Sequence, residues 1–172
     1  MSSIISHPAV PLAIGLGLGS GIISRRLLAA GVVASMAPDL DVYAEMVTTA
    51  IGHRGHTHTL LFAAMCGAGA ALIAPVLHAT RSIAFLFVFL ATASHPLLDA
   101  FTNGGVGIPF FLPFHDARYF MPVTPIEVAP LGVRSFFSMR GVEVLWSELK
   151  WVWLPCAALA GALYAVRRWA PR

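Results

Sequence analysis

Histidine and aspartate are the side chains in this sequence whose types and spacing are best suited to chemistry. They occur in three short clusters, which are the pair Asp39 and Asp41, the segment His53-Arg54-Gly55-His56-Thr57-His58, and the pair His95 and Asp99. Imidazole nitrogens and carboxylate oxygens are ligands that suit zinc, manganese and iron. Cys66 and Cys156 both lie in apolar runs, so we expect no cysteine ligand and no disulfide framework. The clusters therefore indicate one or more divalent-metal sites with mixed nitrogen and oxygen ligands.

Each cluster also has a structural interpretation. An aspartate such as Asp39 can cap a following helix or simply end an apolar run. Histidine, arginine and threonine all occur in membrane interfaces, and Thr57 can cap the helix expected after it. His95 and Asp99 are one helical turn apart on one face. They therefore suit two ligands of one metal, a histidine ligand oriented by a carboxylate, or a structural hydrogen bond at a helix end.

The composition indicates that lipid solvates much of the molecule. The 172 residues include 11 Lys or Arg and 8 Asp or Glu, whereas a soluble domain of this length carries about 43 charged residues. Hydrophobic residues make up 58% of the chain. This excess of apolar residues excludes an ordinary soluble protein. The net charge of +3 is too small for a concentrated basic face, so we expect no nucleic-acid partner.

Apolar runs predict the membrane segments. Residues 60–79, 82–101 and about 151–166 each predict a spanning helix. Residues 8–38 are interrupted by Arg25 and Arg26, whose burial at mid-bilayer would cost roughly 5 to 7 kcal/mol, so we expect the chain to turn there. The segment from Leu27 to Pro38 is about 18 Å long as a helix, too short to cross the bilayer unaided. We expect one all-α domain over residues 1–172, a polytopic transmembrane bundle with about four to five membrane segments.

The arginines predict how the bundle is oriented. Arginines cluster at three alternate turns of the chain, as is typical of cytoplasmic ends; they are Arg25 with Arg26, Arg81, and Arg167 with Arg168. The remaining ends must then share the opposite face of the membrane. That face receives His7, the sequence from Asp39 to His58, and the stretch 94–148. We therefore expect a metal site near one membrane face, on the periplasmic side.

At this level of detail the sequence resembles a known family. The matching motifs, in chain order, are Ser6-His7, Pro38-Asp39-Leu40-Asp41, His53-Arg54-Gly55-His56-Thr57-His58-Thr59, Ser94-His95 through Asp99 to Thr102, Gly105-Val106-Gly107-Ile108-Pro109 and Leu112-Pro113. Together they resemble the LexA-regulated, inner-membrane-bound metal-dependent hydrolases of the YdjM type. The match runs from His7 to about Ile126, and the combination of the two histidine motifs is specific.

The resemblance has implications for fold, location and ligands. It implies a helical protein of the bacterial inner membrane, distantly similar to zinc-dependent phospholipase C and single-strand nucleases. Seven residues carry over as candidate metal ligands: His7, Asp39, Asp41, His53, His58, His95 and Asp99. His56 occupies a variable position of the motif and ranks below its neighbours.

These observations lead to an expected function. We expect a metal-dependent hydrolase in which a divalent metal, zinc before manganese or iron, activates water against an ester or phosphodiester. Asp39 or Asp41 would take the proton, and Arg54 would hold the developing anionic charge. A site at headgroup depth favours a phospholipid or lipid-linked phosphate as substrate. The alternative is a transporter or sensor that binds a divalent metal without turnover.

Other polar residues carry weaker signals. His115 and Asp116 are expected to form a solvated loop pair, although both can reach the site. Glu143 is either a late ligand or base, or an interfacial surface residue. His78, beside Arg81, is expected to be structural. The aromatic stretch within residues 109–125 predicts an interfacial belt or a lid over the site.

Overall fold

A computed structural model describes residues 1–41, 54–130 and 133–169 of the chain. Every regular element in these ranges is helical, and the extended segments form only isolated bridges. The elements are α1 (Ala9–Leu18), α2 (Arg25–Met36), η1 (Ala37–Leu40), η2 (His56–His58), α4 (Leu60–Leu72), α5 (Arg81–Ala100), α6 (Val133–Phe136), α7 (Met139–Glu148), η3 (Leu149–Trp153) and α8 (Leu154–Trp169). The predicted all-α fold class is confirmed for these residues.

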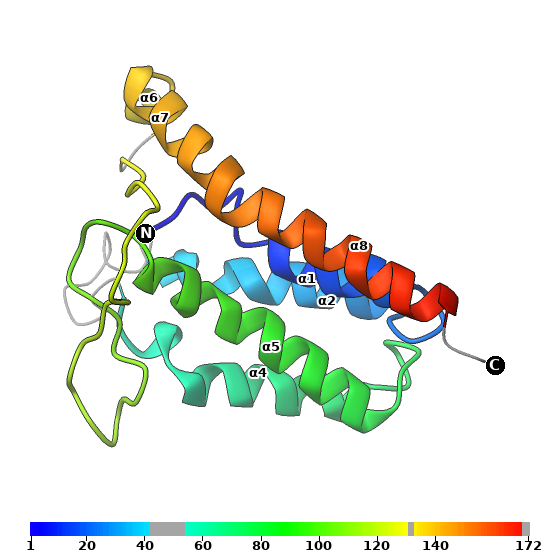
Figure 1. Cartoon of the computed structure of the whole chain (residues 1–172). Helices are drawn as coiled ribbons and strands as arrows, with labels where there is room; N and C mark the ends of the chain where they lie inside the picture. Colours follow the sequence, from blue (N-terminus) through cyan, green and yellow to red (C-terminus); the bar gives the residue numbers. More distant parts are fainter. Residues whose placement is uncertain (42–53, 131–132, 170–172) are drawn as a thin grey trace.

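The helices form a bundle in which α5 is central. It packs against α4 on one side and against α2 on the other, while α1 packs against α8 (Figure 1). Buried apolar side chains from α2, α4 and α5 form the main core, including Leu27, Phe87 and Val88. The segments α7, η3 and α8 continue one another as a single long helix (Figure 1).

Within the described residues, two helices are long and apolar enough to cross a membrane, fewer than the four to five segments predicted. They are Arg81–Ala100 and Met139–Trp169. The first helix ends at Leu18 because Gly19 turns the chain at a φ of 76°, a conformation that favours glycine. The predicted span 60–79 is wrong in its length: α4 ends at Leu72, since Pro75 in the following turn has no N–H to continue the helix.

The long C-terminal helix has the exposure expected of a lipid-facing span. None of the residues of α8 is buried, although the helix is largely apolar. Leu154, Leu159 and Val166 are all exposed large hydrophobic side chains. Lipid is the environment that satisfies such a surface.

Hydroxyl side chains decide where three helices begin. Ser24 accepts a hydrogen bond from the Leu27 N–H, so α2 starts at Arg25 and the chain turns where the arginine pair predicts. Thr59 caps α4 and Thr80 caps α5 in the same way. Each of these caps lies at an end of the bundle.

The two ends of the bundle differ in their polar residues. The turn between α1 and α2, the turn between α4 and α5, and the end of α8 lie at one end, and the arginines at alternate turns lie there (Figure 1). The N-terminal segment, η1, η2 and the end of α5 lie at the other end. This arrangement agrees with the shared side predicted for the histidine and aspartate clusters.

A glycine in α4 provides a test of this packing. A Cβ added at Gly67 would lie 2.9 Å from the carbonyl oxygen of Phe85 and 3.1 Å from the Cβ of Phe89. We expect Gly67→Ala to destabilise the fold by about 1 to 3 kcal/mol, because backbone atoms of α5 cannot move aside. Thermal unfolding in detergent measures the effect.

Gly69 is the matched control for this substitution. It lies on the same helix with nothing within 4 Å of an added Cβ. Gly69→Ala should therefore be neutral or slightly stabilising through helix propensity. Equal shifts in unfolding temperature for the two variants would contradict the described contact of α4 with α5.

Candidate metal centre

Four separate chain segments bring histidine and aspartate side chains together at one end of the bundle. His7 precedes α1, Asp39 lies in η1, His58 ends η2, and His95 with Asp99 lies on the last turns of α5. All five side chains are buried. The spacing of four residues within α5 places His95 and Asp99 on the same face, as predicted.

His95 is the centre of this cluster. Its Nδ1 lies 2.8 Å from the backbone carbonyl oxygen of Ser35. Since a carbonyl oxygen only accepts, Nδ1 of the neutral ring carries the proton and Nε2 directs a lone pair into the cluster. The His95 ring stacks on His7 with 3.6 Å between ring centroids. Its Nε2 lies 3.1 Å from His58 Nε2 and 3.5 Å from Asp39 Oδ1.

His58 is oriented in a similar way by a carboxylate. Its Nδ1 lies 3.2 Å from Asp41 Oδ2, which also accepts a hydrogen bond of 2.7 Å from the hydroxyl of Thr57. The Nδ1 of neutral His58 therefore carries the proton, and Nε2 faces His95. Two nitrogen lone pairs that face each other repel unless a cation lies between them. Two ligands of a tetrahedral zinc ion are about 3.3 Å apart, close to this separation.

Carboxylate oxygens complete the ring of possible ligand atoms. His7 Nε2 lies 3.5 Å from Asp39 Oδ2 and 3.9 Å from Asp99 Oδ1. His58 Nε2 lies 3.7 Å from Asp99 Oδ2. These nitrogen-to-carboxylate separations are wider than typical hydrogen bonds, and they suit groups that share a central ion; His7 Nε2 also lies 3.3 Å from the Ser2 hydroxyl.

Several of these buried atoms have no hydrogen-bond partner within the part of the chain that the structure describes. They are His7 Nδ1, both carboxylate oxygens of Asp39, and Asp99 Oδ2. Burial, followed by the neighbouring carboxylates of Asp99 and Asp41, raises the pKa of Asp39 to about 8. Leaving a buried carboxylate unpaired is costly, and a bound cation removes that cost. The donor set and these unpaired atoms therefore fit a divalent metal.

The possible ligand atoms form one candidate site and not two. Two groups of three residues have potential ligand atoms within 4.8 Å of one another, and both groups contain His95; they are His7 with Asp39 and His95, and His58 with His95 and Asp99. His95 has only Nε2 available, since Nδ1 is bonded to a backbone carbonyl. Both groups must therefore use the same His95 nitrogen.

Arg54 anchors the loop that follows α5. Its buried guanidinium donates to the carbonyl oxygen of Gly104 and the hydroxyl of Thr102, both at 3.1 Å, and Nε lies 3.7 Å from Asp99 Oδ2. Its backbone has a φ of 59°, a strained conformation for a residue with a side chain. Arg118 donates to the Arg54 carbonyl oxygen at 3.1 Å. The guanidinium is therefore held beside an aspartate of the cluster.

The other described residues predicted for the site, apart from Arg54, lie outside the groups of possible metal ligands. Asp41 contacts the cluster through His58, and His53 lies outside the described residues. His56 is exposed, and His115 accepts a hydrogen bond from the Ala117 N–H in an exposed loop.

Glu143 and His78 lie on the surface. Glu143 pairs with Arg140 at 3.1 Å on the exposed side of α7, and His78 lies in the turn before α5 at the opposite end of the bundle. Neither is part of the groups of possible metal ligands formed by the described residues.

Sequence reasoning missed three residues that touch the cluster or its immediate support. The N–H and hydroxyl of Ser2 donate to Asp99 Oδ1 at 2.7 and 3.1 Å. Ser3 contacts Glu148, a fully buried carboxylate of α7. An acidic residue close to a predicted apolar span is a detectable signal for Glu148, whereas Ser2 and Ser3 carry no such signal.

Comparisons with known proteins agree with a membrane location for this chain. The YdjM inner membrane protein family matches residues 1–170. The chain is 42% identical over 181 aligned positions to inner membrane protein YbcI of Escherichia coli (strain K12), a match that covers 98% of this chain and 100% of that protein. No solved structure matches the chain. The motifs that suggested the resemblance are therefore part of a match along nearly the whole chain. This chain belongs to the YdjM family of inner membrane proteins.

Proposed function

We propose that this chain is a metal-dependent hydrolase of the inner membrane. The observation that carries the proposal is the convergence of imidazole and carboxylate groups from four segments, with buried oxygens that lack hydrogen-bond partners in the described ranges. The residues proposed to hold one divalent cation are His7, Asp39, His58, His95 and Asp99. Three nitrogen and two carboxylate ligands suit zinc, and also manganese or iron.

The residues around the cation have separate proposed roles. A divalent ion held by these residues would supply a Lewis acid that makes water more acidic and polarises an ester or phosphoryl group. Asp39 is the better proton acceptor, because Thr57 and His58 engage Asp41 while both Asp39 oxygens lack such partners in the described residues. Arg54 places positive charge beside Asp99, where an anionic substrate group would gain stabilisation.

The surroundings of the cluster support a lipid or lipid-linked substrate. The loop after α5 lies at the same end of the bundle (Figure 1). Aromatic side chains of this loop are exposed. Phe114 in that loop is 84% exposed, and Phe111 and Phe120 are also exposed. Exposed aromatic rings of this kind are typical of the membrane interface. An ester or phosphodiester at headgroup depth is therefore the proposed substrate, on the periplasmic side.

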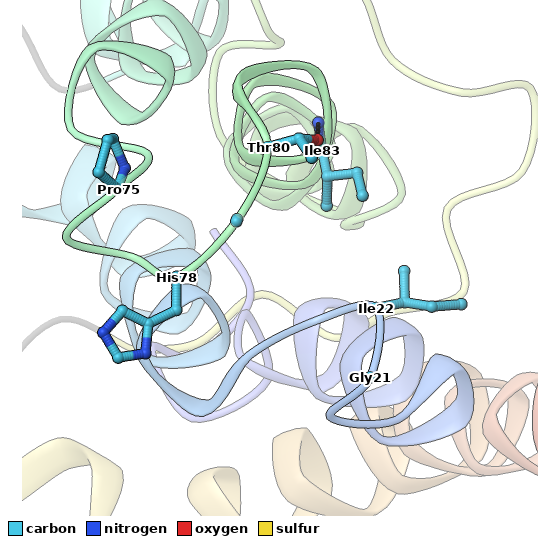
Figure 2. Close-up of a pocket in the computed structure, with 7 residues that line it drawn as sticks. Gly21, Ile22, Pro75, His78, Thr80 and Ile83 are labelled. Carbon is cyan, nitrogen blue, oxygen red and sulfur yellow. Dashed lines mark hydrogen bonds between the residues drawn. The ribbon is translucent and has the colours of Figure 1, made fainter.

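The competing function, transport or sensing of a metal, would require polar groups along the bundle. At the opposite end lies a surface pocket lined by Gly21, Ile22, Pro75, His78, Ala79, Thr80 and Ile83 (Figure 2). Between that pocket and the cluster, α5 contributes Ala84, Phe87 and Val88 to the apolar core. This apolar layer favours an enzyme over a conduction path.

Loss of metal ligands should be measurable directly. We expect His95→Ala and Asp99→Ala to lower bound metal at least tenfold relative to the wild-type protein purified in detergent, because each removes a buried side chain proposed as a ligand. Elemental analysis by mass spectrometry measures the content. His115→Ala, in the exposed loop, is the control and should retain full occupancy; unchanged metal in both α5 variants would argue against the site.

Turnover separates the enzyme from the carrier. We expect hydrolysis of a generic phosphodiester or of phospholipids in a lipid panel, lost on chelation and restored by zinc. Asp39→Asn should reduce kcat by about 10²- to 10⁴-fold, because Asp39 is proposed both to accept the proton and to hold the cation. Metal-loaded protein with no turnover on any of these substrates would instead support the carrier.

The location of the C-terminus tests the orientation. The long helix from Met139 to Trp169 runs from the cluster end toward the arginine end of the bundle (Figure 1). A fluorescent reporter fused after Arg172 should therefore fold in the cytoplasm, and alkaline phosphatase at the same position should be inactive. The reverse pair of results would place the metal site on the cytoplasmic side.

A further inference from the structure

Glu148 is a buried carboxylate to which the proposed reaction gives no role. It lies at the end of α7 and is fully buried, although the helix continues into an apolar span. An ionised group at such a position is costly unless it is paired, and it usually marks a function. Its contacts therefore need an explanation beyond helix formation.

Both oxygens of Glu148 accept hydrogen bonds from Ser3. Oε1 accepts a hydrogen bond from the backbone N–H of Ser3, and Oε2 accepts one of 2.6 Å from the Ser3 hydroxyl. The Ser3 carbonyl oxygen then accepts from the Ser6 N–H at 3.0 Å and from the Ser6 hydroxyl at 2.9 Å. Glu148 thereby holds a closed turn of the N-terminal segment against α7 (Figure 1).

Residues on both sides of Ser3 contact the cluster of histidine and aspartate side chains. Ser2 donates two hydrogen bonds to Asp99 Oδ1, which leaves Asp99 Oδ2 facing His58 Nε2 at 3.7 Å. After the turn, His7 stacks on His95 at 3.6 Å between ring centroids. One short segment therefore orients one proposed ligand and supplies another, and its position depends on Glu148.

We infer that Glu148 is a positioning residue of the metal centre, acting through Ser3 to orient Asp99 and to seat His7. The inference rests on the proposed function in one respect, that the cluster binds a cation. It extends the site to the long C-terminal helix, which contributes no proposed ligand from its described residues. Residues that orient ligands from behind in this way typically change metal affinity 10- to 100-fold.

The chemistry of the contact requires a carboxylate. Ser3 presents two donors, and a carboxylate offers an acceptor oxygen to each. An amide at position 148 would offer one acceptor and would turn an NH₂ group toward the other donor. Glu148→Gln should therefore keep part of the contact that positions the Ser3 segment, and Glu148→Ala should lose that contact completely.

Cobalt titration of the full-length protein in detergent tests the inference. Cobalt(II) reports both affinity and ligand geometry through its visible absorption. We expect Glu148→Ala to weaken cobalt binding about 10- to 100-fold and to change the absorption bands, with Glu148→Gln intermediate. Glu143→Ala is the matched control, since Glu143 lies five residues earlier on α7 with its side chain 59% exposed. It should leave both the affinity and the spectrum unchanged.

Hydrogen exchange of the metal-free protein provides a second measurement. Backbone amides of residues 2–7 should exchange faster in Glu148→Ala than in Glu143→Ala, because the turn is released from α7. If Glu148→Ala does not fold, Ser3→Ala removes only the hydroxyl donor and should still weaken cobalt binding several-fold.

Each outcome separates this inference from the proposed function. A Glu148→Ala protein with reduced thermal stability but wild-type cobalt affinity and spectrum would show a purely structural role and overturn the inference alone. The same conclusion follows if Ser3→Ala binds cobalt like the wild type. A wild-type protein that binds no cobalt would overturn the proposed metal site and this inference together.

Discussion

The interaction on which this site depends is the hydrogen bond between the His95 ring and the backbone carbonyl of Ser35. It commits Nδ1 to donate, so Nε2 must face the buried carboxylates and the second imidazole. Asp41 commits His58 in the same way. Four chain segments thus present lone pairs to one point inside an apolar bundle, where unpaired polar atoms are costly. A cation is the simplest group that satisfies all of them together.

The lengths of the helices decide where that point lies. The helices α1, α2 and α4 are shorter than a full span, and each begins or ends at the level of the cluster. Their ends can therefore supply loop and turn residues to a depth that a complete span would fill with apolar side chains. Among the described residues, α5 is the spanning helix that supplies proposed ligands, and it does so from its final turns. Short helices are thus how an apolar bundle admits a polar site.

Much of this arrangement can be read from the chain itself. Few charges and long apolar runs predict a helical membrane protein, and the pair Arg25 and Arg26 predicts the turn before α2, the helix that Ser24 caps. The paired spacing of His95 and Asp99 predicts their common face. Helix lengths are harder to predict, because hydropathy counts apolar residues and does not register the turn that Pro75 imposes within an apolar run. The sequence likewise does not distinguish the exposed His56 and Glu143 from the buried histidines and carboxylates, because burial depends on which segments pack around each side chain.

The sequence by itself determined the class of fold, the end of the bundle that collects histidine and aspartate, and the residue types available as ligands. Tertiary structure alone decided which nitrogen of each imidazole faces inward, because a backbone carbonyl and a distant aspartate set that choice. It also separated Asp39, inside the cluster, from Asp41, behind His58. The contact between Ser3 and Glu148 joins residues 145 positions apart, and only packing of the first segment against α7 creates it. Local spacing specifies helix faces, whereas the pairing of buried polar groups depends on which segments meet.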